Sequence, residues 1–182
     1  CPNSRARVSG PADPSCPGGT LPRLYQTMGD RAIIGIPHHM ADVYHPFQWE
    51  MLDESKSPVV EIFQTMRGSY EKPGAPGVNN FETIDGLWVV DQLKKGVKVG
   101  FIGGGEHSGT ALGGLLVSEL TRKGLYDAFR ARRCYATSGL NATIDFRSGD
   151  TPMGGVVNTG DTACQFAAEA AEAIHELQIG LN

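Results

Sequence analysis

The sequence predicts an α/β fold, either a layered sheet or a barrel, because short buried strands alternate with helices along the chain. Three apolar runs are typical of buried strands, at residues 31–36, 58–63 and 97–102. Amphipathic helices are expected near residues 84–95 and 121–132. The 24 glycines and 11 prolines among 182 residues indicate many turns and argue against a helical bundle.

Local signals set the limits of these elements. Residues 1–30 begin with a proline-rich stretch and predict an irregular N-terminal arm. Pro37 ends the first strand, and Gly96 stops the first predicted helix. Thr121 is the candidate N-cap of the second helix.

The sequence pattern changes in residues 139–182. Apolar and polar residues alternate over 142–147, which predicts a half-buried strand. The last part of the chain has two interpretations. The apolar spacing over 162–181 fits one side of a helix, and by pattern alone this interpretation is favoured. The same residues also fit two strands, at 164–169 and 174–179.

Composition excludes some classes of function. With 16 basic and 20 acidic residues the net charge is −4, which argues against binding nucleic acid through phosphate neutralisation. No apolar stretch is long enough for a membrane span, so we expect a soluble protein, either cytoplasmic or secreted/periplasmic. The first residue is Cys1 rather than Met, which suggests a processed chain or a fragment. The four cysteines lack metal-finger spacing and are expected to be free thiols, with a bridge between Cys1 and Cys16 as the alternative.

Two pairs of residues follow predicted strands and are candidates for chemistry. His38 and His39 come directly after the first strand, where one imidazole can face a site while the other packs or supports it. Glu106 and His107 follow three glycines at the end of the 97–102 strand, where a carboxylate and an imidazole could bind one metal ion. The alternative for the first pair is a solvated turn.

Three further features have weaker signals. Glu61 lies between apolar residues of a predicted strand, so its carboxylate is expected to be paired or functional. Arg67, in the loop that follows, is a candidate anion clamp, although a surface arginine is the simpler interpretation. His45 and His175 lack partners in the pattern and are expected to be structural.

Several blocks of the sequence together resemble one known family. The block Val-Glu-Ile-Phe-Gln through Gly-Ser-Tyr-Glu, with its Pro-Gly-Ala-Pro loop, is similar to the "vEIyq…rgSYE…GAP" step of the domain of unknown function 3604 family. That family belongs to the PHP (polymerase and histidinol phosphatase) superfamily of metal-dependent phosphoesterases. The other similar blocks follow in family order, at residues 36–39, 100–108, 120–137, 144–146 and 153–154.

The resemblance implies a fold. Residues 31–138 would be the carboxyl-terminal part of a distorted β/α barrel (PHP/TIM-like), and residues 139–182 would begin a small β module. It favours the strands at 164–179 over the helix. It also implies divalent metal ions, such as Zn, Mn or Fe, at the carboxyl ends of the strands.

The resemblance also implies roles for single residues. The metal ligands would be His38, His39, Glu106 and His107. Glu61 and His39 would take part in catalysis, and Arg67 and Arg133 would contact phosphate. The expected activity is hydrolysis of a small-molecule phosphate ester by metal-activated water.

Two departures from the family leave an alternative open. The family step has Asp where this chain has Glu106, and its opening His-x-His step has no counterpart in residues 1–30. A complete barrel takes roughly 250 residues, so another chain or segment would have to complete the site. The alternative is a non-catalytic binding or assembly module. A Rossmann-like nucleotide binder is a third interpretation, based on an imperfect glycine loop at residues 103–109.

Overall fold

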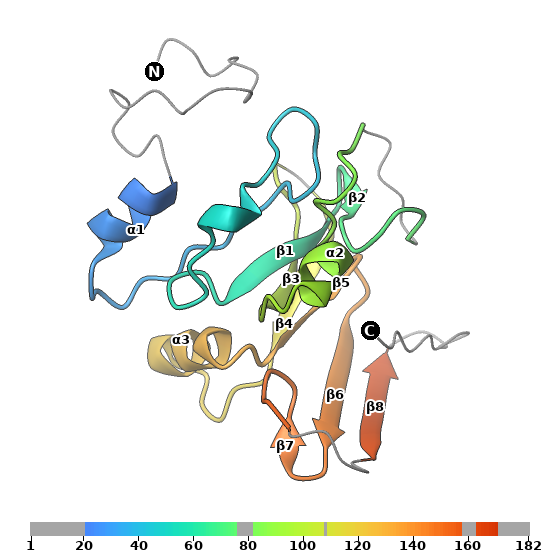
Figure 1. Cartoon of the computed structure of the whole chain (residues 1–182). Coiled ribbons are helices and arrows are strands. Elements are labelled where there is room, and N and C mark those ends of the chain that lie inside the picture. Colours follow the sequence, from blue (N-terminus) through green and yellow to red (C-terminus); the bar gives the residue numbers. More distant parts are fainter. Residues whose placement is uncertain (1–20, 76–81, 108, 158–162, 171–182) are drawn as a thin grey trace.

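A computed structural model describes residues 21–75, 82–107, 109–157 and 163–170 of the chain. Within these ranges the strands form three separate small sheets, and none of them closes on itself (Figure 1). The helices are α1 (Leu21–Met28), α2 (Val89–Lys94) and α3 (Arg122–Arg130), with a short 3-10 turn at Trp49–Met51. None of the helices in the described ranges is both long and apolar enough to cross a membrane.

The first sheet carries the residues of greatest interest. Its order is β2 (Gly68–Ser69), β1 (Val59–Gln64), β3 (Gly100–Gly104). Strand β2 folds back on β1 as an antiparallel hairpin, whereas β3 runs parallel to β1 after a crossover through α2. The carboxyl ends of β1 and β3 therefore lie at the same edge of the sheet.

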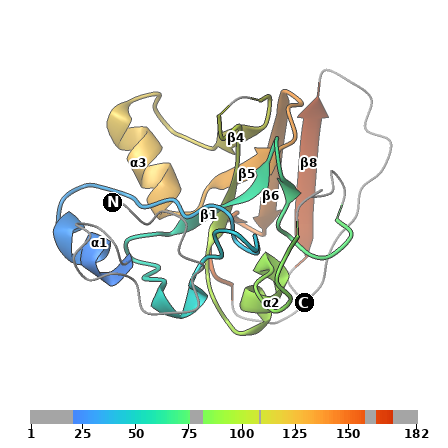
Figure 2. The same ribbon diagram turned by 90° about the horizontal axis from the view of Figure 1, so that it is seen from above.

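The other two sheets are antiparallel. Strand β4 (Leu112–Leu115) pairs with β5 (Cys134–Thr137), and α3 connects them. The third sheet has the order β7 (Thr151–Pro152), β6 (Ala142–Ser148), β8 (Cys164–Ala170). It lies at the lower right of Figure 1, away from the loop that carries residues 40–47. Figure 2 shows α2 and α3 on opposite sides of β1.

The hydrophobic core lies between the first sheet, α2 and the segments that precede β1. Trp49 donates a hydrogen bond from Nε1 to the carbonyl of Leu87 over 2.9 Å, which connects the 3-10 turn to the start of α2. Burial of these apolar side chains is the main stabilising contribution to this part of the chain. The buried members of this cluster are Met40, Ala41, Trp49, Val60, Tyr70, Trp88, Val89 and Val99.

The predicted α/β barrel, even a partial one, is wrong. Among the described strands only β1 and β3 are parallel, and antiparallel pairs predominate. A β/α barrel needs each strand to pair in parallel with the next after a helical crossover. Here β4 instead pairs antiparallel with β5. Most of the regular secondary structure in the described ranges is β-strand, alongside three short helices.

Several single elements agree with the sequence-based expectations. Strands β1, β3 and β6 lie where strands were predicted, and α3 begins after Thr121. The Thr121 side chain accepts a hydrogen bond from the backbone N–H of Gly124, as an N-cap should. Strand β8 confirms a strand over 164–169 and excludes a helix there, since it pairs with β6 along its whole length. The second predicted strand, at 174–179, lies outside the described residues.

Three local expectations are wrong. Residues 31–36 form no strand, because Ile33 and Ile36 are exposed and Pro37 lacks the N–H that a ladder needs. Part of the expected irregular arm is helix α1, which buries Tyr25 and Met28. Helix α2 is shorter than the predicted 84–95 because the backbone N–H of Ile84 donates to the carbonyl of Ala41 instead of entering a helix.

Candidate functional site

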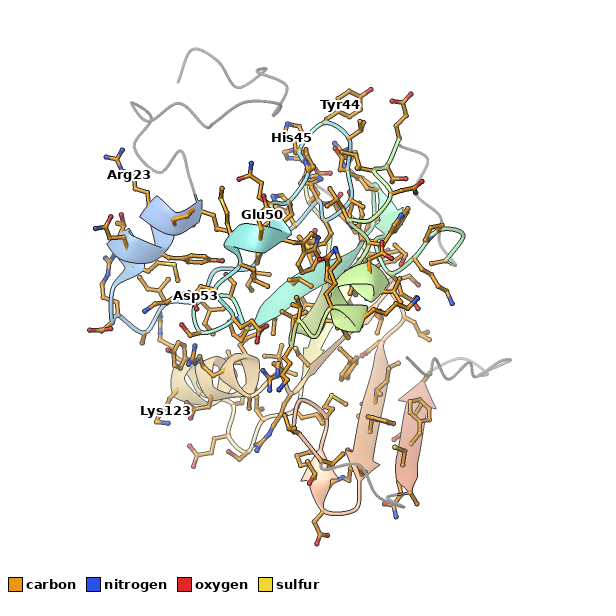
Figure 3. All side chains as sticks on the ribbon, viewed as in Figure 1. Arg23, Tyr44, His45, Glu50, Asp53 and Lys123 are labelled. Atoms are coloured by element: carbon orange, nitrogen blue, oxygen red, sulfur yellow. The ribbon has the colours of Figure 1, made fainter. Side chains whose placement is uncertain are left out.

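Six ionisable side chains line one open pocket of about 600 Å³ at the carboxyl-terminal edge of the first sheet. They come from three parts of the chain: the loop before the 3-10 turn, strand β1, and the turn after β3. The lining residues are His38, His39, His45, Glu61, Glu106 and His107. Figure 3 shows His45, with its neighbour Tyr44, at the top of the molecule, well apart from Lys123 on α3 at the lower left.

Backbone pairing brings these three parts of the chain together. The N–H of Glu61 donates to the carbonyl of Pro37 over 3.0 Å, so the segment that carries His38 and His39 runs beside β1. In the parallel pair of β1 and β3, Glu61 lies opposite Ile102. The turn after β3 therefore places Glu106 near Glu61 and the histidines. The structure thus brings together the two candidate pairs from the sequence, His38 with His39 and Glu106 with His107.

Glu106 lies at the centre of the pocket. Its Oε1 atom is 3.4 Å from Nε2 of His39 and 3.8 Å from Nε2 of His107. The Glu106 and His39 side chains are largely buried, at 13% and 9% exposed, whereas the His107 side chain is 85% exposed. Two imidazole nitrogens thus approach one carboxylate oxygen, one from inside the pocket and one from its mouth.

The backbone at this contact is strained. His39 has a φ of +60° and Glu106 a φ of +57°, in the left-handed region that residues other than glycine rarely adopt. Among the described residues, Arg132 is the remaining non-glycine case, with a φ of +56°. Arg132 directly follows the C-cap of α3, where a left-handed residue is common. His39 and Glu106 have no such role in a helix cap, so their conformation points to a function for these two side chains.

Glu61 forms a second contact within the pocket. Its Oε2 atom accepts a hydrogen bond of 3.1 Å from Nε2 of Gln64, and the Gln64 side chain is fully buried. The same Oε2 atom lies 3.8 Å from Nδ1 of His38. A Cβ atom at position 104 would lie 1.9 Å from Oε1 of Glu61. Gly104 therefore provides the room that this carboxyl group occupies.

Burial alters the protonation of these groups. It lowers the pKa of His38, and it lowers the pKa of His39 to about 4, helped by the neighbouring His38 and Arg67. Burial also raises the pKa of Glu61 to about 7, with a further contribution from Glu106 and against the hydrogen bond from Gln64. Both imidazoles are therefore neutral near pH 7, with a lone pair available on each ring.

The shifted pKa of Glu61 has a consequence for stability. Its folded value of about 7 exceeds its ordinary 4.5, so the folded chain binds more protons between these two pH values. Glu61 contributes fully to the free energy of unfolding below pH 4.5, and this contribution is lost as the pH rises through 7. Between pH 4.5 and 7 we expect the free energy of unfolding of the wild-type chain to fall by on the order of 2–3 kcal/mol relative to that of Glu61→Gln.

Urea unfolding of both proteins at several pH values, with a chelator present, measures this difference. The wild-type minus Glu61→Gln comparison removes the contributions of the histidines, which both proteins share. Parallel pH profiles for the two proteins would contradict the buried state of Glu61.

The two predicted phosphate-binding arginines lie in different surroundings. The Nη1 atom of Arg67 is paired with Oδ2 of the fully buried Asp42, and its Nε atom is 3.8 Å from Oε2 of Glu106. Arg133 lies between α3 and β5 and is not among the residues that line the pocket. The structure thus brings Arg67 next to a lining residue, whereas Arg133 is not itself a lining residue.

Sequence reasoning missed three residues of this region. His45 was expected to be structural but lines the pocket, with Nδ1 3.9 Å from Oδ1 of Asp42. Asp42 and Gln64 were not singled out, although each is fully buried beside the pocket. The Asp42-x-x-His45 spacing in the sequence was the signal that could have identified His45 and Asp42. His175 lies outside the described residues.

The pocket offers the donor types of a metal site without a finished arrangement. Among the described residues, no group of three His, Cys, Asp or Glu side chains is already placed to hold a metal ion. The nearest approach to such a group is His39, Glu106 and His107, which supply two imidazole nitrogens and a carboxylate oxygen. These are ligand types that Zn, Mn and Fe accept.

The chain is similar to two proteins of chlamydial bacteria. An uncharacterised protein of Chlamydia pneumoniae is 30% identical over 163 residues, which cover 77% of this chain and 26% of that protein. An uncharacterised protein of Chlamydia trachomatis serovar D is 25% identical over 162 residues, which cover 76% of this chain and 26% of the relative. The chain thus spans about a quarter of the length of the curated relatives it matches.

No family model and no solved structure matches the chain. The printed names of the two relatives describe no activity. The resemblance to the PHP superfamily therefore stays a prediction from the sequence.

Proposed function

We propose that the pocket binds a divalent cation and that the protein uses it to hydrolyse phosphate esters. The observation that carries the proposal is the approach of His39 and His107 to a single oxygen of Glu106. The left-handed backbone at His39 and Glu106 supports it, because strained residues tend to cluster at functional sites.

The spacing of the donors suits a metal ion of ordinary size. Four ligands at about 2.1 Å from a tetrahedral ion lie about 3.4 Å from one another. The two nitrogen-to-oxygen distances at Glu106 are 3.4 and 3.8 Å. His107 is exposed, so its ring has the freedom to complete the contact, and His38 would be a further ligand from the same loop.

The charge of the pocket also favours a cation. Two carboxyl groups line it, and none of its described lining residues is an arginine or a lysine. The guanidinium of Arg67 already faces the carboxylates of Asp42 and Glu106. An anionic phosphate ester would therefore meet a surface without compensating positive charge, unless a cation is bound first.

The residues around the pocket suggest how hydrolysis would proceed. A bound divalent ion would lower the pKa of a coordinated water and neutralise charge on the phosphoryl oxygens. Glu61 faces the same pocket, held by Gln64, and would accept or return a proton near the attacking water. His39, beside Glu106, would be a ligand of the bound ion. The choice of phosphate esters as substrate rests on the sequence resemblance.

A second candidate function is a metal-binding module without catalytic activity. The absence of a finished three-ligand set among the described residues favours it, because donors from elsewhere would then be needed. Such a module would bind metal weakly as the isolated chain and would not turn over substrate.

A hydrolysis assay on the metal-loaded chain tests the proposal. We expect p-nitrophenyl phosphate or bis(p-nitrophenyl) phosphate to be hydrolysed with Zn, Mn or Fe present, and activity to stop with a chelator. Glu106→Ala and His107→Ala remove donors from the cation itself. They should therefore weaken binding by more than the roughly 10–100-fold that loss of an outer partner costs.

A matched control separates a lost ligand from general damage. Glu50→Ala removes an exposed carboxylate from the 3-10 turn, outside the lining of the pocket. This control should keep the bound metal and the activity. Metal binding without turnover would favour the second candidate, and an active chain that contains no metal would contradict both.

A further inference from the structure

We infer that Arg67, anchored by Asp42, is a positioning residue that orients the Glu106 carboxylate toward the two imidazoles. The effect on metal affinity rests on the proposed cation site, whereas the position of Glu106 in the metal-free protein does not. The sequence suggested a different role for Arg67, as a contact to phosphate. Its surroundings favour contact with carboxylates of the protein instead.

Asp42 is the fixed end of this arrangement. Its side chain is fully buried, and its Oδ1 atom accepts hydrogen bonds from the backbone N–H groups of Tyr44 and His45, over 2.8 and 3.0 Å. Its other oxygen, Oδ2, accepts the Arg67 Nη1–H bond. A carboxylate held by two backbone donors and a guanidinium has little freedom to turn.

Arg67 connects the immobile Asp42 carboxylate to Glu106 in the pocket. Its backbone lies in the turn between β1 and β2, where its N–H donates to the carbonyl of Gln64 over 3.2 Å. Its side chain is only 15% exposed. The planar guanidinium meets Asp42 at Nη1 and approaches Glu106 at Nε, so one rigid fork bridges two carboxylates.

The bridge has a defined effect on Glu106. The Oε2 atom lies toward Arg67, at 3.8 Å, and the Oε1 atom lies toward His39 and His107. A glutamate side chain has three torsions, and fixing them costs conformational entropy when a ligand binds. Because Arg67 already orients Glu106, less of this entropy is lost on binding. Partners behind a metal ligand commonly orient it in this way.

The main test is the double variant Asp42→Asn/Arg67→Gln. It removes one negative and one positive charge together, so neither Asp42 nor Arg67 is left as a charge without its partner and the net charge near the pocket is unchanged. Asn keeps an oxygen for the two backbone donors. Loss of the guanidinium beside Glu106 would by itself strengthen the attraction of a cation, so a weaker cation affinity reports the orientation of Glu106 and not simple attraction.

We expect the folded double variant to bind Co²⁺ about 10-fold to 100-fold more weakly than the wild type. The visible absorption of bound Co²⁺ should also change, because it depends on ligand geometry. Arg67→Lys keeps the charge but lacks the fork, so it should not restore wild-type affinity. Wild-type affinity and spectrum in the double variant would overturn the inference and leave Arg67 a structural residue.

A metal-free readout separates this inference from the proposed function. In crystals grown with a chelator, the Glu106 carboxylate of the double variant should leave His39 or occupy more than one rotamer. An unchanged Glu106 in those crystals would overturn the inference. If the wild type binds no metal and Glu106 still moves, the proposed function fails and the positioning role stands.

Discussion

Replacing Tyr70 by alanine is expected to lower the free energy of unfolding by about 3–5 kcal/mol. Tyr70 is the largest fully buried side chain of the described residues and belongs to the core cluster beneath the pocket. Its backbone also connects elements, since its N–H donates to Ile62 over 2.7 Å and its carbonyl accepts from Val89 over 3.0 Å. Removal of the ring would leave a cavity between β1 and α2.

Tyr70→Phe is the matched control for this prediction. It keeps the ring and removes only the hydroxyl, which lies 3.5 Å from Nδ1 of His39. Loss of this weak contact should cost less than about 1.5 kcal/mol. Urea unfolding followed by tryptophan fluorescence measures both variants. A cost below about 1 kcal/mol for Tyr70→Ala would mean that this core does not stabilise the fold.

Replacing Gly104 by alanine should disturb the pocket and destabilise the chain by about 1–3 kcal/mol. The added methyl carbon would lie 1.9 Å from Oε1 and 3.0 Å from Cδ of Glu61, far inside contact distance. Glu61 is only 8% exposed and is held by Gln64, so it has little room to retreat. Relief of the clash would break that hydrogen bond or shift β3 away from β1.

A double-mutant cycle with Glu61→Ala isolates this clash. In the Glu61→Ala background the carboxyl group is gone, so Gly104→Ala should cost little. The coupling between the two changes is then most of the 1–3 kcal/mol, measured by urea unfolding in the presence of a chelator. Equal costs in both backgrounds would show that Gly104 is needed for a reason other than Glu61.

Short-range patterns in the sequence were sufficient for several elements. The apolar run around Val60 predicted β1, the alternation over 142–147 predicted β6, and Thr121 predicted the start of α3. Each signal is contained within a few residues, because propensity, capping and alternation act locally. The same local signal failed at residues 31–36, whose apolar side chains the structure leaves partly exposed.

Strand pairing depends on contacts that no local pattern records. Strand β4 contains Gly113 and Gly114, which give no alternation of side chains, so its antiparallel pairing with β5 was not visible. The predicted barrel assumed parallel pairing throughout, and a resemblance of short blocks could not test that assumption. Register and direction are set by tertiary packing, which overrides local preference.

The sequence identified most of the residues of the candidate site but not how they are arranged. His38, His39, Glu61, Glu106 and His107 were all singled out from the sequence, and all of them line the pocket. The left-handed backbone at two of them was not foreseen, since neither is glycine or asparagine. The anchoring of Arg67 was also missed, because its partner Asp42 is 25 residues distant in the sequence.

The most direct test of the central claim is the metal content of the purified chain. The protein is stripped with a chelator, dialysed against low micromolar Zn²⁺ or Mn²⁺, and analysed by inductively coupled plasma mass spectrometry. We expect at least one ion per wild-type chain and a background level in Glu106→Ala, because the carboxylate is the shared donor. A wild-type chain that retains no metal after this treatment would show that the pocket binds no cation.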